Sequence, residues 1–233
     1  DSTSSNHVRE DYSIGINDKL DQKIKIGIPS DYLKDVSGDI LSQIENTKKA
    51  LIKHNVEFVD VEFKTTEYAL STYYILAPAE ASSNLARYDG IRYGVREDGK
   101  SLDDIYLNSR TKGFGDEVTR RILIGAYVLS AGYYDAYYRQ AQKVRRLIKD
   151  DFQRIFNDVD FILTPTTPNE AFKIGDKLDP ISMYKNDIYT VPTSLAGLPG
   201  ISIPSGLSTN GLPLGIQFIG NYFEEKKLLQ IAA

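Results

Sequence analysis

The sequence contains no cysteine and only two histidines, His7 and His54, and this shortage excludes several kinds of catalytic and metal site. Without cysteine the chain can form no disulfide bond, no zinc–thiolate centre and no cysteine nucleophile. Two histidines are too few for a histidine-rich metal site, so we expect no bound metal. His54 ends an amphipathic helical pattern, where a solvated position near the helix dipole is expected, and His7 lies in a polar stretch. Neither is expected to be the base of a Ser-His-Asp triad.

Long apolar runs and several common motifs are also missing. No apolar run approaches the ~20 residues that span a bilayer, and the opening DSTSSNHVREDYS lacks the pattern of a signal peptide. A formal net charge of −4 disfavours a dedicated nucleic-acid surface or a polybasic membrane surface. GxSxG, P-loop and GxGxxG motifs do not occur. We therefore expect a cytoplasmic protein that does not bind membranes.

Strand and helix patterns alternate along the first part of the chain. Residues 1–22 are polar and aperiodic, which predicts a leader or loop. A strand pattern at 23–28, a helical pattern at 38–54 and an alternating strand pattern at 56–63 follow. Such a strand–helix–strand unit predicts two parallel strands joined by a helical crossover. Residues 23–233 are predicted to form one α/β core.

Further helices and strands are interleaved along the rest of the chain. Helical patterns occur at about 66–86, in two stretches of 102–130 that separate near Gly113, and at about 133–157. The stretch RYDGIRYGVREDGKS predicts an exposed loop, DFILTPTTP a buried strand, and GISIPSG with LPLGIQFIG a hairpin turning near Asn210-Gly211. The predicted fold class is α/β, with a mixed β-sheet core flanked by helices. The chain has no initiator methionine and ends, LLQIAA, within a helical pattern, so we expect it to be part of a longer protein.

Six stretches together resemble a known family. In chain order they are YYILAPAEASSNLARYDGIRYG, GFGDEVTRRI, SAGYYDAYY, VDFILTPTTP, NDIYTVPTSLAGLPGISIP and GLPLGIQFIG. They cover nearly the whole chain and resemble the C-terminal half of proteins of the amidase signature family. EASSNLARYDG and SAGYYDAYY resemble, within that family, the A subunits of tRNA-dependent amidotransferases. The resemblance implies that residues 1–233 are the C-terminal part of a single amidase domain.

This resemblance implies an activity and a set of partners. An A subunit of this kind hydrolyses glutamine through an acyl-enzyme and supplies ammonia. The B subunit uses ATP and Mg²⁺ to amidate misacylated Glu-tRNA(Gln), or in some organisms Asp-tRNA(Asn), and the C subunit joins the other two. ATP, Mg²⁺ and tRNA are then expected at the B subunit, and no cofactor is expected in this chain.

The family's catalytic residues form a Ser–cis-Ser–Lys triad, which lies upstream of the region matched here. Its glycine- and serine-rich segment does not occur in this sequence. The serine pairs Ser4-Ser5 and Ser82-Ser83 lie outside any glycine-rich loop, so turn or cap roles are expected for them. We therefore expect substrate-binding residues but no catalytic residue in this chain, and no activity from the isolated chain.

Three residues are predicted to bind glutamine. By resemblance, Arg121 binds the α-carboxylate, Asp187 binds the α-ammonium and Tyr73 contributes its phenol at the rim. A guanidinium suits a carboxylate because two parallel charge-assisted hydrogen bonds fix both position and orientation. From the residues alone, Arg121 could also be a surface arginine and Asp187 a helix cap. Chemistry alone does not separate Tyr73 from Tyr74.

Neighbouring residues are predicted to have structural roles. Arg120 lies on a different helical face from Arg121, and we expect it to be an ordinary surface charge. The tyrosines of 133–138 are expected to pack in the core or at an interface, with their hydroxyl groups hydrogen bonded. The paired carboxylates Asp150-Asp151 are explained by charge on a helix surface.

Two other functions remain open at this stage. One is a stand-alone hydrolase of the same family that acts on small amides, and the other is a non-catalytic scaffold that binds a partner. A carboxylate-binding arginine together with an aspartate favours an amino-acid substrate over a simple amide.

Overall fold

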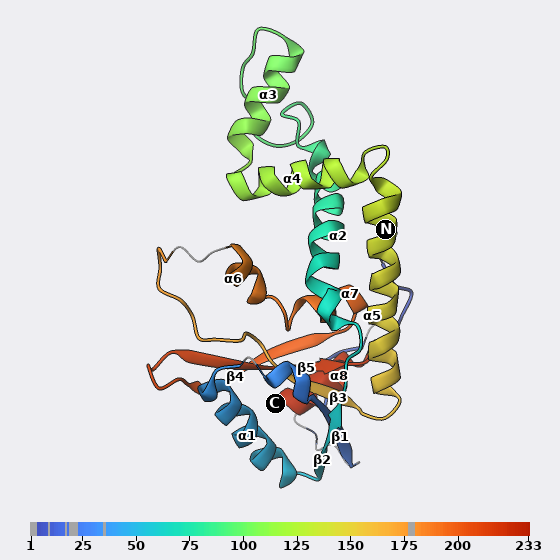
Figure 1. The fold of residues 1–233 in the computed structure, drawn as a ribbon, viewed down its shortest axis with the longest axis vertical. Coiled ribbons are helices and arrows are strands. Elements are labelled where there is room, and N and C mark those ends of the chain that lie inside the picture. The colour runs from blue at the N-terminus through green and yellow to red at the C-terminus, as the bar shows by residue number, and fades with distance from the viewer. Residues whose placement is uncertain (1–3, 9, 17, 19–22, 35, 177–179) are drawn as a thin grey trace. The chain divides into compact units, whose positions relative to one another are not determined.

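The chain forms two units in the computed structural model, which describes residues 4–8, 10–16, 18, 23–34, 36–176 and 180–233. Unit 1 comprises residues 1–70 and 146–233 and contains a β-sheet, and unit 2 comprises residues 71–145 and is helical (Figure 1). The assignment of residues 1–233 to one amidase domain stays a prediction.

The polar leader is described in part. Residues 4–8, 10–16 and 18 form no helix or strand, as predicted, and the rest of 1–22 lies outside the described residues. His7 stacks on Phe223 with 4.1 Å between ring centroids, and the carbonyl of Gly15 accepts a hydrogen bond from Gln230. The described leader residues thus contact the C-terminal end of unit 1.

Unit 1 is built on a mixed sheet of five strands in the order β2-β1-β3-β5-β4. The strands are β1 (Ile24–Pro29), β2 (Val56–Val61), β3 (Phe161–Pro165), β4 (Gly200–Leu207) and β5 (Pro213–Gly220). β1 is parallel to β2 and β3, whereas β5 is antiparallel to β3 and β4. The predicted α/β class with a mixed sheet is confirmed (Figure 1).

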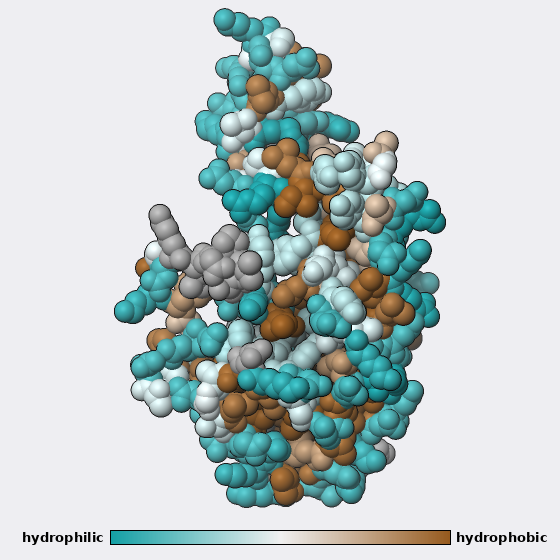
Figure 2. Space-filling view, viewed as in Figure 1, coloured by the Kyte–Doolittle hydropathy of each residue, from teal (hydrophilic) through white to brown (hydrophobic). Residues whose placement is uncertain are grey.

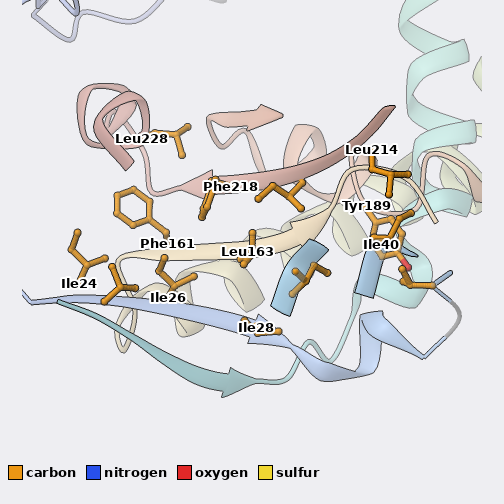
Figure 3. Packing of buried hydrophobic residues seen from close by; sticks show 14 residues of the cluster. Ile24, Ile26, Ile28, Ile40, Phe161, Leu163, Tyr189, Leu214, Phe218 and Leu228 are labelled. Atoms are coloured by element: carbon orange, nitrogen blue, oxygen red, sulfur yellow. The ribbon is translucent and has the colours of Figure 1, made fainter. Parts of the chain in front are cut away.

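The hydrophobic core of unit 1 follows the alternation of the strands, since successive side chains point to opposite faces of a sheet. Alternate residues of β1, β3 and β5 meet side chains of α1 (Gly38–Ile52) and α8 (Glu225–Ala232) in one cluster. Figure 3 shows this cluster, whose members include Ile26, Ile40, Phe161, Phe218 and Leu228. Each fully buried side chain of this size contributes about 1.5–3 kcal/mol.

Local signals in unit 1 start and stop the elements near the predicted positions. The Ser37 hydroxyl accepts a hydrogen bond from Ile40 N at the start of α1. The β1–α1–β2 unit has the predicted parallel strands. Between β4 and β5, Gly211 adopts φ 79°, a left-handed conformation that favours glycine, and Ser208 N donates to Leu212 O at 2.8 Å. The hairpin and its turn are therefore confirmed.

Unit 2 contains the predicted helices. They are α2 (Ala69–Asn84), which enters unit 2 at Ser71, α3 (Leu102–Gly113) and α4 (Asp116–Leu129). Residues 88–101 contain no helix or strand, as predicted, and Arg110 of α3 donates from Nη1 to the carbonyls of Leu85 and Tyr88. The end of unit 2 that α3 and this loop form is mainly hydrophilic (Figure 2).

The helix predicted at about 133–157 begins with a wider turn. Residues Tyr134–Arg139 form a π-helix, and α5 (Gln140–Phe156) continues from it. Tyr133 packs on Tyr127 of α4 with 4.3 Å between ring centroids, and Tyr137 lies 5.9 Å from Tyr133. These side chains are 40–50% exposed. Tyr133 therefore packs against α4 outside the core, and the other expectation for these tyrosines, packing at an interface, stays a prediction.

One of the two paired carboxylates of α5 is buried, which corrects the prediction of two surface charges. Asp151 is 6% exposed, and its Oδ2 accepts hydrogen bonds from Lys64 N at 2.6 Å and from Thr65 N at 3.1 Å. Its Oδ1 accepts from Arg154 at 2.7 Å. Asp151 therefore fixes the turn that follows β2. Asp150 is exposed and pairs with Arg146, as predicted.

Replacing Asp151 by asparagine is expected to lower the free energy of unfolding by about 2 kcal/mol, because a buried amide cannot satisfy all the donors that the carboxylate accepts. Urea unfolding followed by circular dichroism measures this change. Asp150→Asn is the matched control, and its effect should stay within about 0.5 kcal/mol. Equal stability of the two variants would contradict the structural role of Asp151.

Candidate functional site

Arg121 lies in the second turn of α4, at a position set by the start of that helix. The first turn carries Asp116 and Glu117, and carboxylates are favoured there by the helix dipole. Glu117 and Arg121 are four residues apart, which places their side chains on one face of the helix. The Nε of Arg121 donates to Oε1 of Glu117 at 3.0 Å.

Arg121 also contacts both candidate tyrosines, which lie on α2. Its Nη1 donates to the Tyr73 hydroxyl at 3.4 Å. Its Cζ lies 6.0 Å from the centroid of the Tyr74 ring, within the range of a cation–π contact. The two tyrosine rings meet edge to face with 5.0 Å between centroids. The predicted pair of Arg121 and Tyr73 is therefore brought together within unit 2, and the two tyrosines differ in the contact they make.

A close approach of α4 to α2 makes these contacts possible. A Cβ atom placed on Gly125 would lie 2.0 Å from the carbonyl oxygen of Pro78 and 2.6 Å from Cβ of Ser82. Only glycine fits at this point, where α4 crosses α2 (Figure 1). Gly125 follows Arg121 by one helical turn, so the crossing holds Arg121 beside Tyr73.

Arg120 is exposed, as predicted, but it is not isolated from the site. Its Nη1 donates to Oε2 of Glu117 at 2.7 Å, so one carboxylate bridges both arginines. Glu117 was not among the residues predicted from the sequence. The spacing of Glu117 to Arg120 and Arg121, three and four residues, was the signal that could have identified it.

The charge of Arg121 is stabilised by its neighbours. The hydrogen bond with Glu117 and then that with Tyr73 raise the pKa of Arg121 above its ordinary value. The guanidinium thus stays charged at every physiological pH. A permanently charged, partly exposed guanidinium can bind a carboxylate.

Asp187 belongs to unit 1, whereas Arg121 and Tyr73 belong to unit 2. It lies in the turn between α6 (Pro180–Lys185) and α7 (Val191–Ala196) and is half-buried. The N-cap of α7 is Thr190, so Asp187 is not the cap residue of that helix. Its backbone carbonyl accepts a hydrogen bond from Val191 N at 3.0 Å.

The turn that carries Asp187 is anchored to the sheet through Tyr189. This tyrosine is 4% exposed, and its hydroxyl donates to the Tyr32 carbonyl at 2.8 Å, just beyond β1. Its own carbonyl accepts from the buried Gln217 of β5 at 2.9 Å. A cavity of about 480 Å³ beside the turn is lined in part by Tyr32 and Lys185. The segment that carries Asp187 is thereby hydrogen bonded to residues of β5 and of the turn after β1.

Other candidate groups have structural surroundings. Ser5 accepts a hydrogen bond from the backbone of His7, and Ser82 and Ser83 lie in the last turn of α2, which agrees with turn or helix-end roles. His54 is exposed just beyond α1, as predicted. In the part of the chain that the structure describes, no three His, Asp or Glu side chains gather as metal ligands would. None of the helices formed there combines the length and apolar character needed to cross a membrane.

Curated relatives match the chain over its whole length. It is 50% identical over 234 residues to the A subunit of glutamyl-tRNA(Gln) amidotransferase from Halothermothrix orenii, covering 100% of this chain and 49% of that protein. It is 54% identical over 237 residues to the same protein of Pelagibacter ubique, covering 100% of this chain and 48% of that protein. The predicted resemblance to these A subunits is confirmed. The chain spans about half the length of the curated relatives it matches.

Solved structures and a family model agree with this resemblance. The crystal structure of the glutamyl-tRNA(Gln) amidotransferase A subunit from Thermotoga maritima matches 94% of this chain and 43% of its own, with a TM-score of 0.70 and 39% identity. A bacterial aryl acylamidase of the amidase signature family shares the fold, with a TM-score of 0.69 and 18% identity over 97% of this chain and 45% of its own. The family model described as Amidase matches residues 1–229. The chain belongs to the amidase family.

Proposed function

We propose that this chain is the glutamine-binding part of a glutamine-hydrolysing A subunit of a tRNA-dependent amidotransferase. One observation carries the proposal: the charged guanidinium of Arg121, held by Glu117 and Tyr73, lies in a chain that matches such A subunits over its whole length. A simple amide carries no carboxylate, so a guanidinium prepared to bind one favours an amino-acid amide as substrate.

In this proposal glutamine is bound by its unreactive end. Arg121 binds the α-carboxylate, the carboxylate of Asp187 binds the α-ammonium, and the Tyr73 hydroxyl lies at the rim. The side-chain amide then extends toward the nucleophile. Holding the two charged groups of the substrate fixes the position of the amide, and such positioning supplies a large part of the catalytic effect in many enzymes.

The remaining chemistry is assigned to other parts of the assembly. We propose that the Ser–cis-Ser–Lys triad lies in the protein outside these 233 residues. Ammonia released there is used by the B subunit, which holds ATP, Mg²⁺ and the misacylated Glu-tRNA(Gln) or Asp-tRNA(Asn), while the C subunit joins the other two. No cofactor is assigned to this chain, and the complex is proposed to be a cytoplasmic heterotrimer.

Ammonia release by the complete protein that carries this chain tests the proposal. Glutamine is expected to be hydrolysed far faster than acetamide or propionamide. The isolated chain is expected to release no ammonia from any of them. A preference for simple amides over glutamine would instead favour a stand-alone amidase and contradict the proposal.

Replacing Asp187 by asparagine is expected to lower kcat/KM for glutamine by about 10- to 100-fold, since a hydrogen bond to a charged group contributes about 1.5–3 kcal/mol. The informative comparison uses 4-carbamoylbutyrate, which is glutamine without its α-amino group. Because this substrate has no ammonium to bind, its kcat/KM should change little. Equal losses with the two substrates would show that Asp187 has only a structural role.

A further inference from the structure

The carboxylate of Glu117 lies between two guanidinium groups and gives one oxygen to each. Oε1 accepts from Nε of Arg121 at 3.0 Å, and Oε2 accepts from Nη1 of Arg120 at 2.7 Å. The pairing with Arg120 keeps Oε2 away from Arg121. Glu117 therefore contacts Arg121 through a single hydrogen bond and not as a bidentate partner.

The donors of Arg121 form two edges, and Glu117 occupies only one of them. A guanidinium can bind a carboxylate side-on, through Nε and Nη2, or end-on, through Nη1 and Nη2. Glu117 takes Nε, and the Tyr73 hydroxyl takes one hydrogen of Nη1 in a long contact of 3.4 Å. Within the described residues, Nη2 donates no hydrogen bond. Nη2 and the second hydrogen of Nη1 thus remain for a ligand.

The local charge also favours an incoming anion. Two guanidinium groups share one carboxylate, so this cluster keeps an excess of one positive charge. If Glu117 paired with Arg121 alone, the two charges would cancel and the attraction for a ligand carboxylate would be weaker. Because Arg120 also pairs with Glu117, the net positive charge of the cluster still attracts a second carboxylate.

We propose that Glu117 is a positioning residue, which fixes the guanidinium of Arg121 so that its end-on edge faces the α-carboxylate of glutamine. This inference rests on the proposed function, because it concerns the same binding site. Glu117 touches neither the substrate nor the reacting atoms. Its contribution is to limit the rotamers of Arg121 before glutamine binds. Without Glu117, this long side chain would lose its conformational freedom on binding, and that loss of entropy would weaken the affinity.

Steady-state kinetics of the complete protein with Glu117→Ala and Glu117→Gln test this role. In Glu117→Ala, the KM for glutamine is expected to rise about tenfold with kcat changed less than about twofold, because binding weakens while the chemical step is unaltered. In Glu117→Gln, the amide oxygen still accepts from Nε of Arg121, so the KM is expected to return to within about threefold of the parent value. Asp116→Ala is the matched control, since Asp116 occupies the same helical turn and carries the same charge. Its KM should not change.

Two results would overturn the inference. One is an unchanged KM in Glu117→Ala, and the other is an equal rise in Asp116→Ala, which would reflect the helix terminus and not Arg121. Arg121→Ala separates this failure from that of the proposed function. If Arg121→Ala raises the KM and Glu117→Ala does not, the inference fails and the proposed function stands. If neither variant changes the KM, the proposed function itself fails. Glu117→Gln, which is isosteric, guards against a loss of folding in the alanine variant.

Discussion

Replacing Arg121 by alanine in the complete protein is expected to lower kcat/KM for glutamine by about 30- to 1,000-fold, which corresponds to about 2–4 kcal/mol. The change removes the side chain that is proposed to bind the α-carboxylate through two charge-assisted hydrogen bonds. It also leaves Glu117 paired with Arg120 alone, so the local excess of positive charge disappears. Most of the loss should appear in KM, because the α-carboxylate is bound equally in the ground state and the transition state.

A matched control for this variant lies in the same unit. Arg139 also pairs with a carboxylate four residues earlier, Asp135, at the same distance of 3.0 Å. The Arg139 side chain is 61% exposed against 33% for Arg121. Arg139→Ala should therefore leave kcat/KM within about twofold of the parent value, as expected for a surface ion pair. Unchanged kcat/KM in Arg121→Ala would refute the proposed role of this residue.

Arg121→Lys distinguishes charge from geometry. Lysine keeps the positive charge but cannot form two parallel hydrogen bonds to a carboxylate. We expect kcat/KM to fall about tenfold in this variant, between the parent and Arg121→Ala. Full activity of Arg121→Lys would mean that charge alone is required and that the open end-on edge has no part in binding.

Replacing Gly125 by alanine is expected to lower the free energy of unfolding by about 3 kcal/mol, at the upper end of what one extra methyl group costs in a packed interior. The methyl group would lie 2.0 Å from a backbone oxygen of Pro78, which cannot rotate away as a side chain can. The α2 and α4 helices must therefore separate. The contact of Arg121 with Tyr73 should weaken too, so kcat/KM for glutamine should also fall.

Gly113→Ala is the matched control for this prediction. A Cβ atom at Gly113 meets nothing within 4 Å, and the residue ends α3 without a left-handed backbone. Alanine there should be neutral or should stabilise the protein by up to about 1 kcal/mol, because it restricts the unfolded chain. Urea unfolding measures both variants, and hydrogen exchange of the α2 and α4 amides locates the change. Equal stability of Gly125→Ala and Gly113→Ala would contradict the close helix crossing.

Much of the fold could be predicted from the sequence because local patterns and turn residues agree. The pattern at 23–28 predicted a strand, and the core cluster contains its residues Ile24, Ile26 and Ile28. The Asn210-Gly211 pair predicted the hairpin turn, since glycine adopts the positive φ found there. The fold class followed from the interleaving of helices and strands.

Other features depended on contacts between segments that the pattern does not reveal. Asp151 was predicted to be a surface charge because it follows Asp150 on a helix, but the turn at Lys64 covers it. The tyrosines of 133–138 were expected in a core or at an interface, and at the π-helical turn Tyr133 and Tyr137 lie beside Tyr127 with large exposed areas. A π-helical turn contains about one residue more than an α-helical turn, so it changes which side chains lie on the same face of the helix.

The residues of the candidate site were likewise predicted only in part. Arg121 and Tyr73 were identified by family resemblance, and the structure brings them into contact within unit 2. The sequence did not separate Tyr73 from Tyr74, because consecutive residues differ by about 100° around a helix and only packing decides which phenol reaches Arg121. Glu117 lay within reach of sequence reasoning through its spacing to both arginines.

The open edge of Arg121 has a consequence for turnover. Hydrolysis converts glutamine to glutamate, and the α-carboxylate is the same in both. If Arg121 binds that end, as proposed, it holds the product as firmly as the substrate and cannot by itself favour product release. Discrimination between the two must then arise at the other end of the molecule, where a neutral amide becomes a negatively charged acid. With the role proposed for Arg121, inhibition by glutamate is thus expected together with affinity for glutamine.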